Sequence, residues 1–344
     1  MRFFALSAFL IGFFTTAPLG AFEIETETLF EVDQPTATLR VISTSDQDLF
    51  TPMVLAFQAE NPTVSVAYTS VSSTELMQAV YSENVPFDVA ISSAMDLQVK
   101  LANDGFTQPY QSAQTNLLPD WGNWRGHVFA FTQEPASIVI SPSAFAGLSL
   151  PETRQELIQT LRENPDRFRN RIGTYDVRTS GLGYLFATQD ARTSETYWRL
   201  MEVMGGLGTQ LYCCSNAMID DVQSGTLAVG YNVLGSYADA RKAQGDDIHV
   251  IAPRDFTTVM LRSAVIPVNA PSPTLAQGFV DHLLLAAWGS EVPDYYPFPP
   301  IANQNQNAQT SPRPIRLGPG LLVFLDQLKR RLFLEAWTNA VVQP

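Results

Sequence analysis

Apolar and polar residues in the first third of the chain form a pattern that predicts strands and helices in turn. Short apolar runs with period-two alternation indicate strands, and each run leads into a segment with helical spacing. Asn61-Pro62 and Gly105 end two of these helices. Strands that alternate with helices indicate an α/β fold with a largely parallel sheet. The expected strands are 38–43, 64–69 and 86–91, and the expected helices are 49–60, 76–82 and 95–104.

The same pattern returns after an apolar crossing near residue 130, so we expect two lobes joined by two crossing strands. The apolar stretch 257–267 leads the chain back to the first lobe. Two C-terminal helices, 274–288 and 321–340, are expected to pack on that lobe, and the Pro-, Asn- and Gln-rich segment 292–314 reads as a loop. The expected first lobe is 38–132 plus 265–344, and the expected second lobe is 133–264.

The chain begins with the features of a secretory signal peptide. Arg2 precedes an apolar run from Phe3 to Phe14, and small residues follow near Gly20-Ala21. We therefore expect residues 1–21 to be removed and the mature protein to lie outside the cytoplasm. No later apolar run approaches the ~20 residues that span a bilayer.

The 344 residues carry a formal charge of −13, and 45% of them are hydrophobic. That length exceeds what one hydrophobic core usually serves, which favours the two-lobed reading. An acidic chain with no basic tract argues against nucleic acid and against anionic membrane surfaces. An anionic ligand therefore needs a locally positive pocket.

The chain holds two cysteines, Cys213 and Cys214, and they are adjacent. Neighbouring cysteines form either a strained vicinal disulfide or remain two buried thiols, and we favour buried thiols. Without clustered histidines they do not predict a zinc site.

Catalytic signatures are missing from the sequence. It contains no G-x-S-x-G elbow, P-loop, G-x-G-x-x-G turn or H-E-x-x-H helix. The histidines (His127, His249 and His282) fall in different expected elements, so we predict neither a metal site nor a cofactor. Hydroxyl groups, an arginine, an asparagine and tyrosines bind ligands well but are poor general acids or bases near neutral pH. This inventory favours a binding protein over an enzyme.

Two expected strands end in clusters of hydroxyl residues, each just before a helix. These clusters are Ser43-Thr44-Ser45 and Ser92-Ser93. Ligands of open α/β sheets gather at the carboxyl ends of strands, so both clusters are candidate ligand contacts. The alternative is that each hydroxyl only caps its helix.

A polar turn inside residues 172–188 is the candidate contact from the second lobe. Arg178 offers a planar cation, and Thr179 or Ser180 is expected to cap the helix that follows. The start of a helix attracts anions, and Gly181 and Gly183 would let a ligand approach the backbone. The alternative is an ordinary capped helix whose arginine reaches solvent.

Several segments resemble the periplasmic solute-binding proteins of extracellular family 1, in the ferric-iron-binding-like branch. The segments are VISTSDQDLFTPMVLAFQAENPTVSVAYTSVSSTELMQAV and FDVAISSAMDLQVKLANDGF. A narrower subgroup, associated with loci that encode a two-component sensor kinase, resembles GTYDVRTSGLGYLF, GYNVLGSYADAR and RPIRLGPGLLVFLDQLKRRLFLEAW.

The resemblance implies a type II periplasmic binding protein that closes over one ligand by a hinge motion. It implies an ABC permease and ATPase as partners, or the periplasmic domain of a sensor kinase, and a monomeric protein. Ferric-iron binders present a paired tyrosine where this chain has Leu234-Gly235, with Tyr231 and Tyr237 nearby. Fe(III) prefers anionic oxygen donors and this site lacks most of them, so ferric iron is an alternative and not the ligand that we expect.

The expected ligand is a small organic anion, carboxylated or phosphorylated. Sensing for a kinase is the alternative to transport. The residues expected to contact the ligand are Ser43, Thr44, Ser45, Ser92, Ser93, Arg178, Thr179, Ser180, Asn232 and Tyr237.

Overall fold

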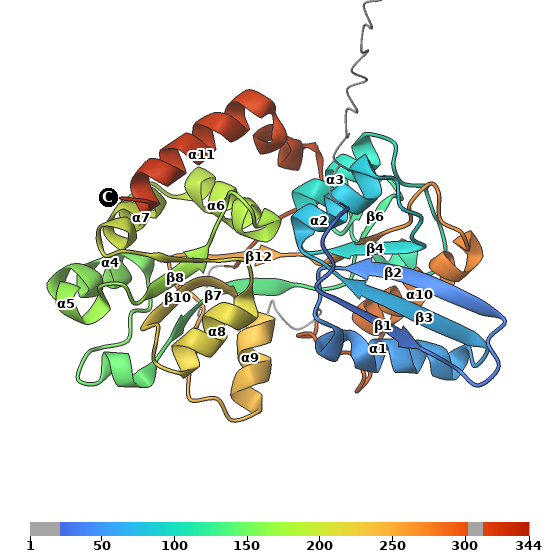
Figure 1. Ribbon diagram of the computed structural model, residues 1–344, viewed down its shortest axis with the longest axis horizontal. Coiled ribbons are helices and arrows are strands. Elements are labelled where there is room, and N and C mark those ends of the chain that lie inside the picture. The colour runs from blue at the N-terminus through green and yellow to red at the C-terminus, as the bar shows by residue number, and fades with distance from the viewer. Residues whose placement is uncertain (1–20, 302–311, 344) are drawn as a thin grey trace, which may run out of the picture.

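A computed structural model describes residues 21–301 and 312–343 of the protein. Residues 1–20 of the expected signal peptide and residues 302–311 of the expected loop 292–314 lie outside these residues. The molecule has two lobes, each built on one β-sheet with helices on both faces (Figure 1). Within the described ranges, no helix is both long enough and apolar enough to cross a bilayer.

The first lobe is built on the sheet β1-β3-β2-β4-β13-β6-β5. Strands β2, β3 and β4 run parallel, whereas β1, β13 and β6 pair antiparallel with their neighbours. Its elements are β1 (Thr26–Phe30), β2 (Ala37–Ser43), α1 (Gln47–Glu60), β3 (Val64–Ser70), α2 (Ser73–Met77), η1 (Gln78–Ser82), β4 (Val89–Ser92), α3 (Met95–Asn103), η2 (Thr115–Leu117), β5 (Asn123–Trp124), β6 (Val128–Ala130), β13 (Ser263–Val265) and α10 (Pro273–Trp288).

The second lobe is built on the sheet β14-β12-β7-β10-β8-β9, and β11 also pairs with β7. Its elements are β7 (Glu134–Ile140), η3 (Pro142–Phe145), α4 (Arg154–Glu163), α5 (Pro165–Phe168), β8 (Ile172–Tyr175), α6 (Gly181–Thr193), α7 (Thr196–Gly206), β9 (Gln210–Tyr212), α8 (Ser215–Gln223), β10 (Val229–Leu234), α9 (Gly235–Ala243), β11 (His249–Ile251), β12 (Thr257–Met260) and β14 (Pro312–Pro314). The tail continues as η4 (Pro319–Leu325) and α11 (Gln327–Val341).

Both sheets are buried on two faces, which explains their continuous apolar strands. Val41 and Ile42 of β2 are fully buried and point to opposite sides of the sheet. Phe50 of α1 packs on the side of Val41, and Met95 of α3 packs on the side of Ile42. In the second lobe, α4 and α7 cover one face of the sheet, and α8 and α9 cover the other (Figure 1).

The last helix differs from the expectation that both C-terminal helices pack on the first lobe. Helix α10 does lie in that lobe, against α1 and β6. Helix α11 instead packs on α7 of the second lobe, and the preceding η4 contacts α3 of the first lobe (Figure 1). Phe333 and Trp337 of α11 are buried in the second-lobe core, which explains this placement.

Strand β1 was not anticipated, because the sequence before residue 38 reads as a polar terminus. Its residues pair antiparallel with β3, from Thr26 opposite Ser70 to Phe30 opposite Val66. Edge pairing of the backbone does not need an apolar side-chain pattern, so a half-exposed strand of this kind leaves a weak signal.

A buried ion pair joins the two segments that cross between the lobes. Nε of Arg262 lies 3.1 Å from Oε1 of Glu134, and both side chains are fully buried. Thr132 donates its hydroxyl to the same carboxylate oxygen at 2.8 Å, and Ser236 of α9 donates to the other oxygen. The Arg262 amide also donates to the Thr132 hydroxyl at 2.9 Å. The two crossings and α9 are thereby held together at one point.

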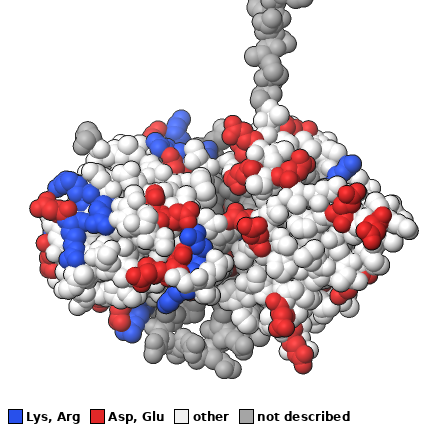
Figure 2. All heavy atoms as spheres, turned by 60° about the horizontal axis from the view of Figure 1, so that its bottom comes forward, with Lys and Arg blue, Asp and Glu red and all other residues white. Residues whose placement is uncertain are grey.

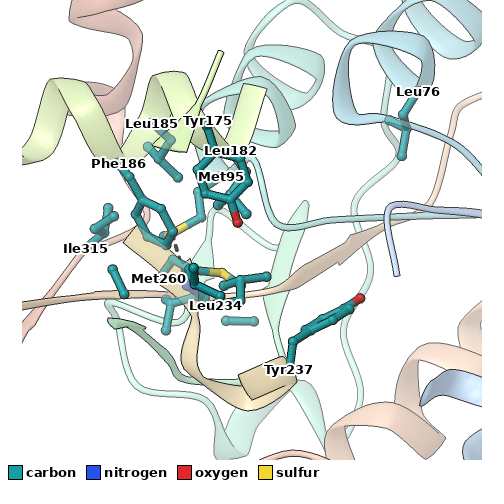
Figure 3. Close-up of a cluster of buried hydrophobic side chains, with 14 of the residues drawn as sticks. Leu76, Met95, Tyr175, Leu182, Leu185, Phe186, Leu234, Tyr237, Met260 and Ile315 are labelled. Carbon is teal, nitrogen blue, oxygen red and sulfur yellow. Dashed lines mark hydrogen bonds between the residues drawn. The ribbon is translucent and has the colours of Figure 1, made fainter. Parts of the chain in front are cut away.

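An apolar cluster also continues from one lobe into the other. Met95 of α3 packs with Leu182, Leu185 and Met260 of the second lobe (Figure 3). The Leu261 amide lies 3.2 Å from Sδ of Met95. The lobes are therefore in contact behind the hinge, and separating them would expose apolar surface.

Replacing Glu134 by Gln should destabilise the protein strongly. The change leaves the Arg262 guanidinium buried without a counter-charge, and removing one partner of a buried pair costs about 3–5 kcal/mol. Urea denaturation measures the free energy of unfolding. Glu152→Gln is the matched control, because Glu152 pairs with Arg254 at the surface, where such pairs are worth about 0–1 kcal/mol. Equal losses in the two variants would contradict the role of the buried pair.

Asp96 should make stability depend on pH. Its side chain is buried at the start of α3 and Oδ1 has no hydrogen-bond partner, so burial raises its pKa from 3.8 to about 7. The contribution of Asp96 to the free energy of unfolding is fully present below pH 3.8, where the carboxyl is neutral in the folded and the unfolded protein. This contribution is lost as the pH rises to about 7.

The stability of wild type relative to Asp96→Asn should therefore fall by about 2–3 kcal/mol between pH 5 and pH 7.5. Urea denaturation at both pH values checks this. Asp104→Asn, on the residue that follows α3, is the control, because Lys100 lowers the pKa of Asp104 and its contribution stays constant above pH 5. A parallel change in both variants would contradict the assignment to Asp96.

Candidate functional site

A cleft of about 650 Å³ lies between the lobes. Its first-lobe wall comes from the carboxyl ends of β2, β3 and β4, as expected for an α/β sheet. Its second-lobe wall comes from the N-terminal ends of α6 and α8 and from α9. The lining residues include Glu23, Glu25, Thr44, Asp46, Ser72, Ser73, Thr74, Glu75, Ser93, Tyr175, Arg178, Thr179, Ser180, Leu182, Cys213, Cys214, Ser215, Asn216, Leu234 and Tyr237.

The two expected hydroxyl clusters do meet at one end of the first sheet. Strands β2 and β4 are parallel neighbours, and the hydroxyl groups of Thr44 and Ser93 lie 3.3 Å apart. These two residues line the cleft. The Ser93 amide donates to the Thr44 hydroxyl at 3.1 Å, which fixes the turn.

The other three serines of these clusters are buried beneath the cleft wall. The hydroxyl of Ser43 accepts a hydrogen bond from the amide of Ser45, and the hydroxyl of Ser92 accepts one from the amide of Ala94. Each donor follows its acceptor by two residues in the sequence. Ser45 offers its carbonyl oxygen to Tyr68 and lies below the surface of the turn. These serines shape the turns, and they are absent from the residues that line the cleft.

The polar turn before α6 has the expected local structure. Ser180 is the N-cap of α6 and accepts a hydrogen bond from the Gly183 amide at 3.2 Å. Arg178 lines the cleft with Thr179 and Ser180. Its guanidinium forms a two-pronged pair with Asp176, with contacts of 2.8 and 2.6 Å. The hydrogen bonds from Arg178 lower the pKa of Asp176 against the opposing effect of burial.

The glycines of this turn serve packing between parts of the protein. A Cβ on Gly181 would lie 2.6 Å from the Ser73 hydroxyl of the first lobe, and the Gly181 amide donates to that hydroxyl at 2.9 Å. A Cβ on Gly183 would lie 2.3 Å from Cβ of Tyr175. Gly181 therefore allows the two lobes to touch, and Gly183 allows α6 to sit on β8.

Asn232 lies in the interior of the second lobe, away from the cleft lining. It occupies the left-handed region with φ of 62°, at an irregularity in the pairing of β10 with β7. Its amide donates to Asp190 at 3.1 Å, and Asp190 also accepts from Tyr231 and Thr258. Arg154 completes this buried network through a 2.8 Å bond to the Tyr231 hydroxyl. The network holds the second lobe together.

Tyr237 lines the cleft, and its hydroxyl connects the two lobes. It accepts a hydrogen bond from the Asp46 amide at 3.2 Å. Asn216 of α8 donates to the carboxylate of the same Asp46. Thr74 donates to the Thr179 carbonyl at 3.2 Å further along the cleft. These contacts hold the lobes close together.

Sequence reasoning did not identify several cleft residues. Ser72, Ser73 and Thr74 form a third hydroxyl cluster, placed after β3 just as the other clusters follow β2 and β4, so the same signal was present there. Asp46 and Asn216 carried no signal, because their contact joins segments 170 residues apart.

The cysteines correct our expectation of buried thiols. Cys213 and Cys214 form a vicinal disulfide, and both residues are exposed at the cleft. Cys214 is also the N-cap of α8, and no side chain caps this helix. The expectation rested on the rarity of the strained vicinal ring, and the disulfide was the alternative that it left open.

Carboxylates gather on the first-lobe wall of the cleft. Glu23, Glu25, Asp46 and Glu75 line it, against one lining cation, Arg178. Burial raises the pKa of Glu25, and the nearby charge of Asp46 raises it further. Burial likewise raises the pKa of Asp46, although Arg262 partly offsets this effect. The cleft is therefore polarised between its walls.

Comparison with known proteins identifies the family. The sequence family of bacterial extracellular solute-binding proteins matches residues 43–289, which is more than half of the chain. The chain belongs to this family. Its members bind solutes, in agreement with the preference for a binding protein over an enzyme, and work outside the cytoplasm with ABC permeases and ATPases.

Solved structures agree with this solute-binding family. The substrate-binding protein of an ABC transporter from Agrobacterium tumefaciens is 33% identical, with a TM-score of 0.83, over 92% of this chain and 98% of that one. AfuA from Actinobacillus pleuropneumoniae, with fructose-6-phosphate bound, is 15% identical, with a TM-score of 0.68, over 90% and 100% of the two chains. Iron-bound HitA from Pseudomonas aeruginosa is 16% identical, with a TM-score of 0.65, over 88% and 99%. A comparison with curated proteins finds no match.

In residues 21–301 and 312–343, no group of three or more His, Cys, Asp or Glu residues is arranged to hold a metal ion. The candidate site is thus described by its hydroxyls, its charges and its helix ends.

The vicinal disulfide should be present in the isolated solute-binding protein. Alkylation with iodoacetamide under denaturing conditions should add no group before reduction and two groups after it, because both sulfurs are bonded. Intact mass spectrometry counts the adducts. The variant Cys213→Ser is the control and should take up one group without reduction. Two adducts on the unreduced wild type would show that the thiols are free.

Proposed function

We propose that the protein captures a small organic solute with a carboxylate or phosphate group and delivers it to an ABC importer from the periplasm. The observation that carries the proposal is the cleft between the lobes, which is lined from both sides by hydroxyl groups and helix N-termini. Fructose-6-phosphate in AfuA is a phosphorylated solute on the same fold, which supports this ligand class.

The second-lobe wall supplies the groups that suit an anion. Helices α6 and α8 both begin at the cleft, and their first amides carry partial positive charge. The N-terminus of α8 has no side-chain cap, so its amides suit an external acceptor. Arg178 stands at the same wall, although its pairing with Asp176 compensates part of its charge.

The expected ligand contacts within the cleft are therefore a subset of the ten named from sequence. Thr44 and Ser93 would contact the solute from the first lobe, and Thr179, Ser180 and Tyr237 from the second. Arg178 would add a charged contact at the mouth of the cleft. Ser43, Ser45, Ser92 and Asn232 would act by shaping the walls.

A sensing role for a two-component kinase is the second candidate. One solved structure with this fold, 17% identical and with a TM-score of 0.57, is described as a two-component system protein that mediates signal transduction. The same cleft would then serve detection, and the closed form would dock on the kinase. A gene neighbourhood with a permease and an ATPase supports uptake, whereas a kinase–regulator pair alone supports sensing.

Native mass spectrometry of mature protein, purified without refolding, tests the proposed ligand. We expect a carried-over molecule with a carboxylate or phosphate group in the wild type. Calorimetry with that molecule should show binding weakened about ten- to a hundredfold in Arg178→Ala, because a charge-assisted hydrogen bond is worth about 1.5–3 kcal/mol.

The matched control is Arg254→Ala, since Arg254 is another exposed, ion-paired arginine of the second lobe that does not line the cleft. It should leave affinity unchanged. Equal affinity in Arg178→Ala and wild type would remove Arg178 from the site, and a carried-over metal ion or simple cation would contradict the ligand class.

A further inference from the structure

The first-lobe wall of the cleft carries more negative charge than an anionic ligand alone would tolerate. Asp46, Glu25 and Glu75 line this wall together with Glu23. Asp46 and Glu25 are close enough for the charge of one to raise the pKa of the other. A carboxylate or phosphate placed against this wall would meet like charges at short range.

The asymmetry of the cleft continues over the whole of each lobe. Residues 21–132 and 262–301 contain 17 Asp and Glu against 4 Lys and Arg, whereas residues 133–261 and 312–343 contain 17 against 16. Figure 2 shows acidic side chains over the first lobe on the right and most of the basic ones over the second lobe on the left. The field across the cleft therefore runs from a negative wall to a nearly neutral one.

The second-lobe wall is suited to the opposite charge. It carries Arg178 and the starts of α6 and α8, the latter without a side-chain cap. The same wall also carries apolar and aromatic groups, among them Leu182, Leu234 and the ring of Tyr175. A molecule that spans the cleft thus meets carboxylates at one end and amide donors at the other.

We propose that the ligand is dipolar, with a cationic group held by Asp46 and Glu25 and an anionic group held by the second-lobe wall. This inference rests on the proposed function and narrows its ligand class from organic anions to zwitterions. The cationic group is an ammonium or amidinium, because these donate hydrogen bonds to carboxylates. The anionic group is a carboxylate or phosphate, as in the proposed function.

Closure of the lobes provides the reason why both charges are needed. Asn216 donates to the Asp46 carboxylate, and Tyr237 accepts from the Asp46 amide, so Asp46 already links the two walls. A cationic group of the ligand beside Asp46 would compensate the negative charge of this carboxylate, which closure buries between the lobes. A purely anionic ligand would add to that charge and oppose closure.

Two matched sets of molecules test the proposal on the mature wild-type protein at pH 7.5. The first set is 6-aminohexanoate, hexanoate and hexylamine, and the second is phosphoethanolamine, ethyl phosphate and ethanolamine. Isothermal titration calorimetry measures affinity, and thermal unfolding measures stabilisation by the bound state. We expect the zwitterion of at least one set to bind roughly ten- to a hundredfold tighter than both of its partners.

The variant Asp46→Asn keeps an oxygen that can accept from Asn216 and removes the charge. It should weaken binding of the zwitterion at least tenfold and leave or improve binding of the matching anion. Glu31→Gln, an exposed residue of the first lobe outside the cleft lining, is the control and should change neither. The thermal unfolding of both variants without ligand shows that they are folded.

The outcomes separate this inference from the proposed function. Anions that bind as tightly as the zwitterions, or an equal loss for both in Asp46→Asn, overturn the dipolar ligand and leave the proposed function standing. Binding by the amines alone overturns both. Failure of both zwitterions to bind overturns the dipolar ligand for both types of anionic group.

Discussion

The buried pair of Glu134 and Arg262 is the interaction on which the two-lobed arrangement depends. It lies where the chain leaves the first lobe and where it returns, and it draws Thr132 and Ser236 into one network. Because two charges without water are costly, each side chain requires the other. The crossing segments therefore share one fixed point, and relative motion of the lobes has to bend the chain around it. The cleft opens and closes next to this point, since α9, which carries Ser236, also carries Tyr237.

Small residues and direct hydrogen bonds bring the lobes together beside that point. Gly181 leaves room for Ser73 of the opposite lobe, and its amide donates to the serine hydroxyl. Thr74, the residue after Ser73, makes a second contact of this kind with the carbonyl of Thr179, which lies two residues before Gly181. These groups satisfy each other when the lobes touch and would be satisfied by water when the lobes separate. The free-energy difference between the two forms is therefore small, and a ligand that binds both walls can shift the equilibrium toward the form with the lobes in contact.

Local sequence signals predicted the elements well and predicted the site in part. Ser180 could be identified as an N-cap because capping depends on a few neighbouring residues. The meeting of Thr44 with Ser93 could be expected because parallel strands end at one edge of their sheet. The inward position of Asn232 could not be predicted, because it depends on an irregular strand pairing and on a hydrogen bond to Asp190, which is distant in sequence. The vicinal disulfide of Cys213 and Cys214 was only the second choice, because adjacent cysteines seldom form the strained ring.

The polarity of the cleft was beyond sequence reasoning for a similar reason. Arg178 is a cation in the sequence, but its pairing with Asp176 compensates part of that charge in the fold. Glu25 directly precedes β1 in a segment with little apolar pattern, and the hydrogen bond from its amide to the Ser70 carbonyl, 2.9 Å long, holds it beside β3 at the cleft. Charges of a site therefore follow from tertiary arrangement, whereas hydroxyl turns follow from the order of strands and helices.

The C-terminal segment spans both lobes, and this has a consequence for how far they can part. The 3-10 helix η4 rests on α3, and α11 rests on α7, with Asp326 alone between them. A connection of one residue cannot extend far. Wide separation of the lobes must therefore break the contact of η4 with α3 or the contact of α11 with α7. The C-terminal segment thereby limits how far the lobes can separate, and the unliganded protein should open its cleft only slightly.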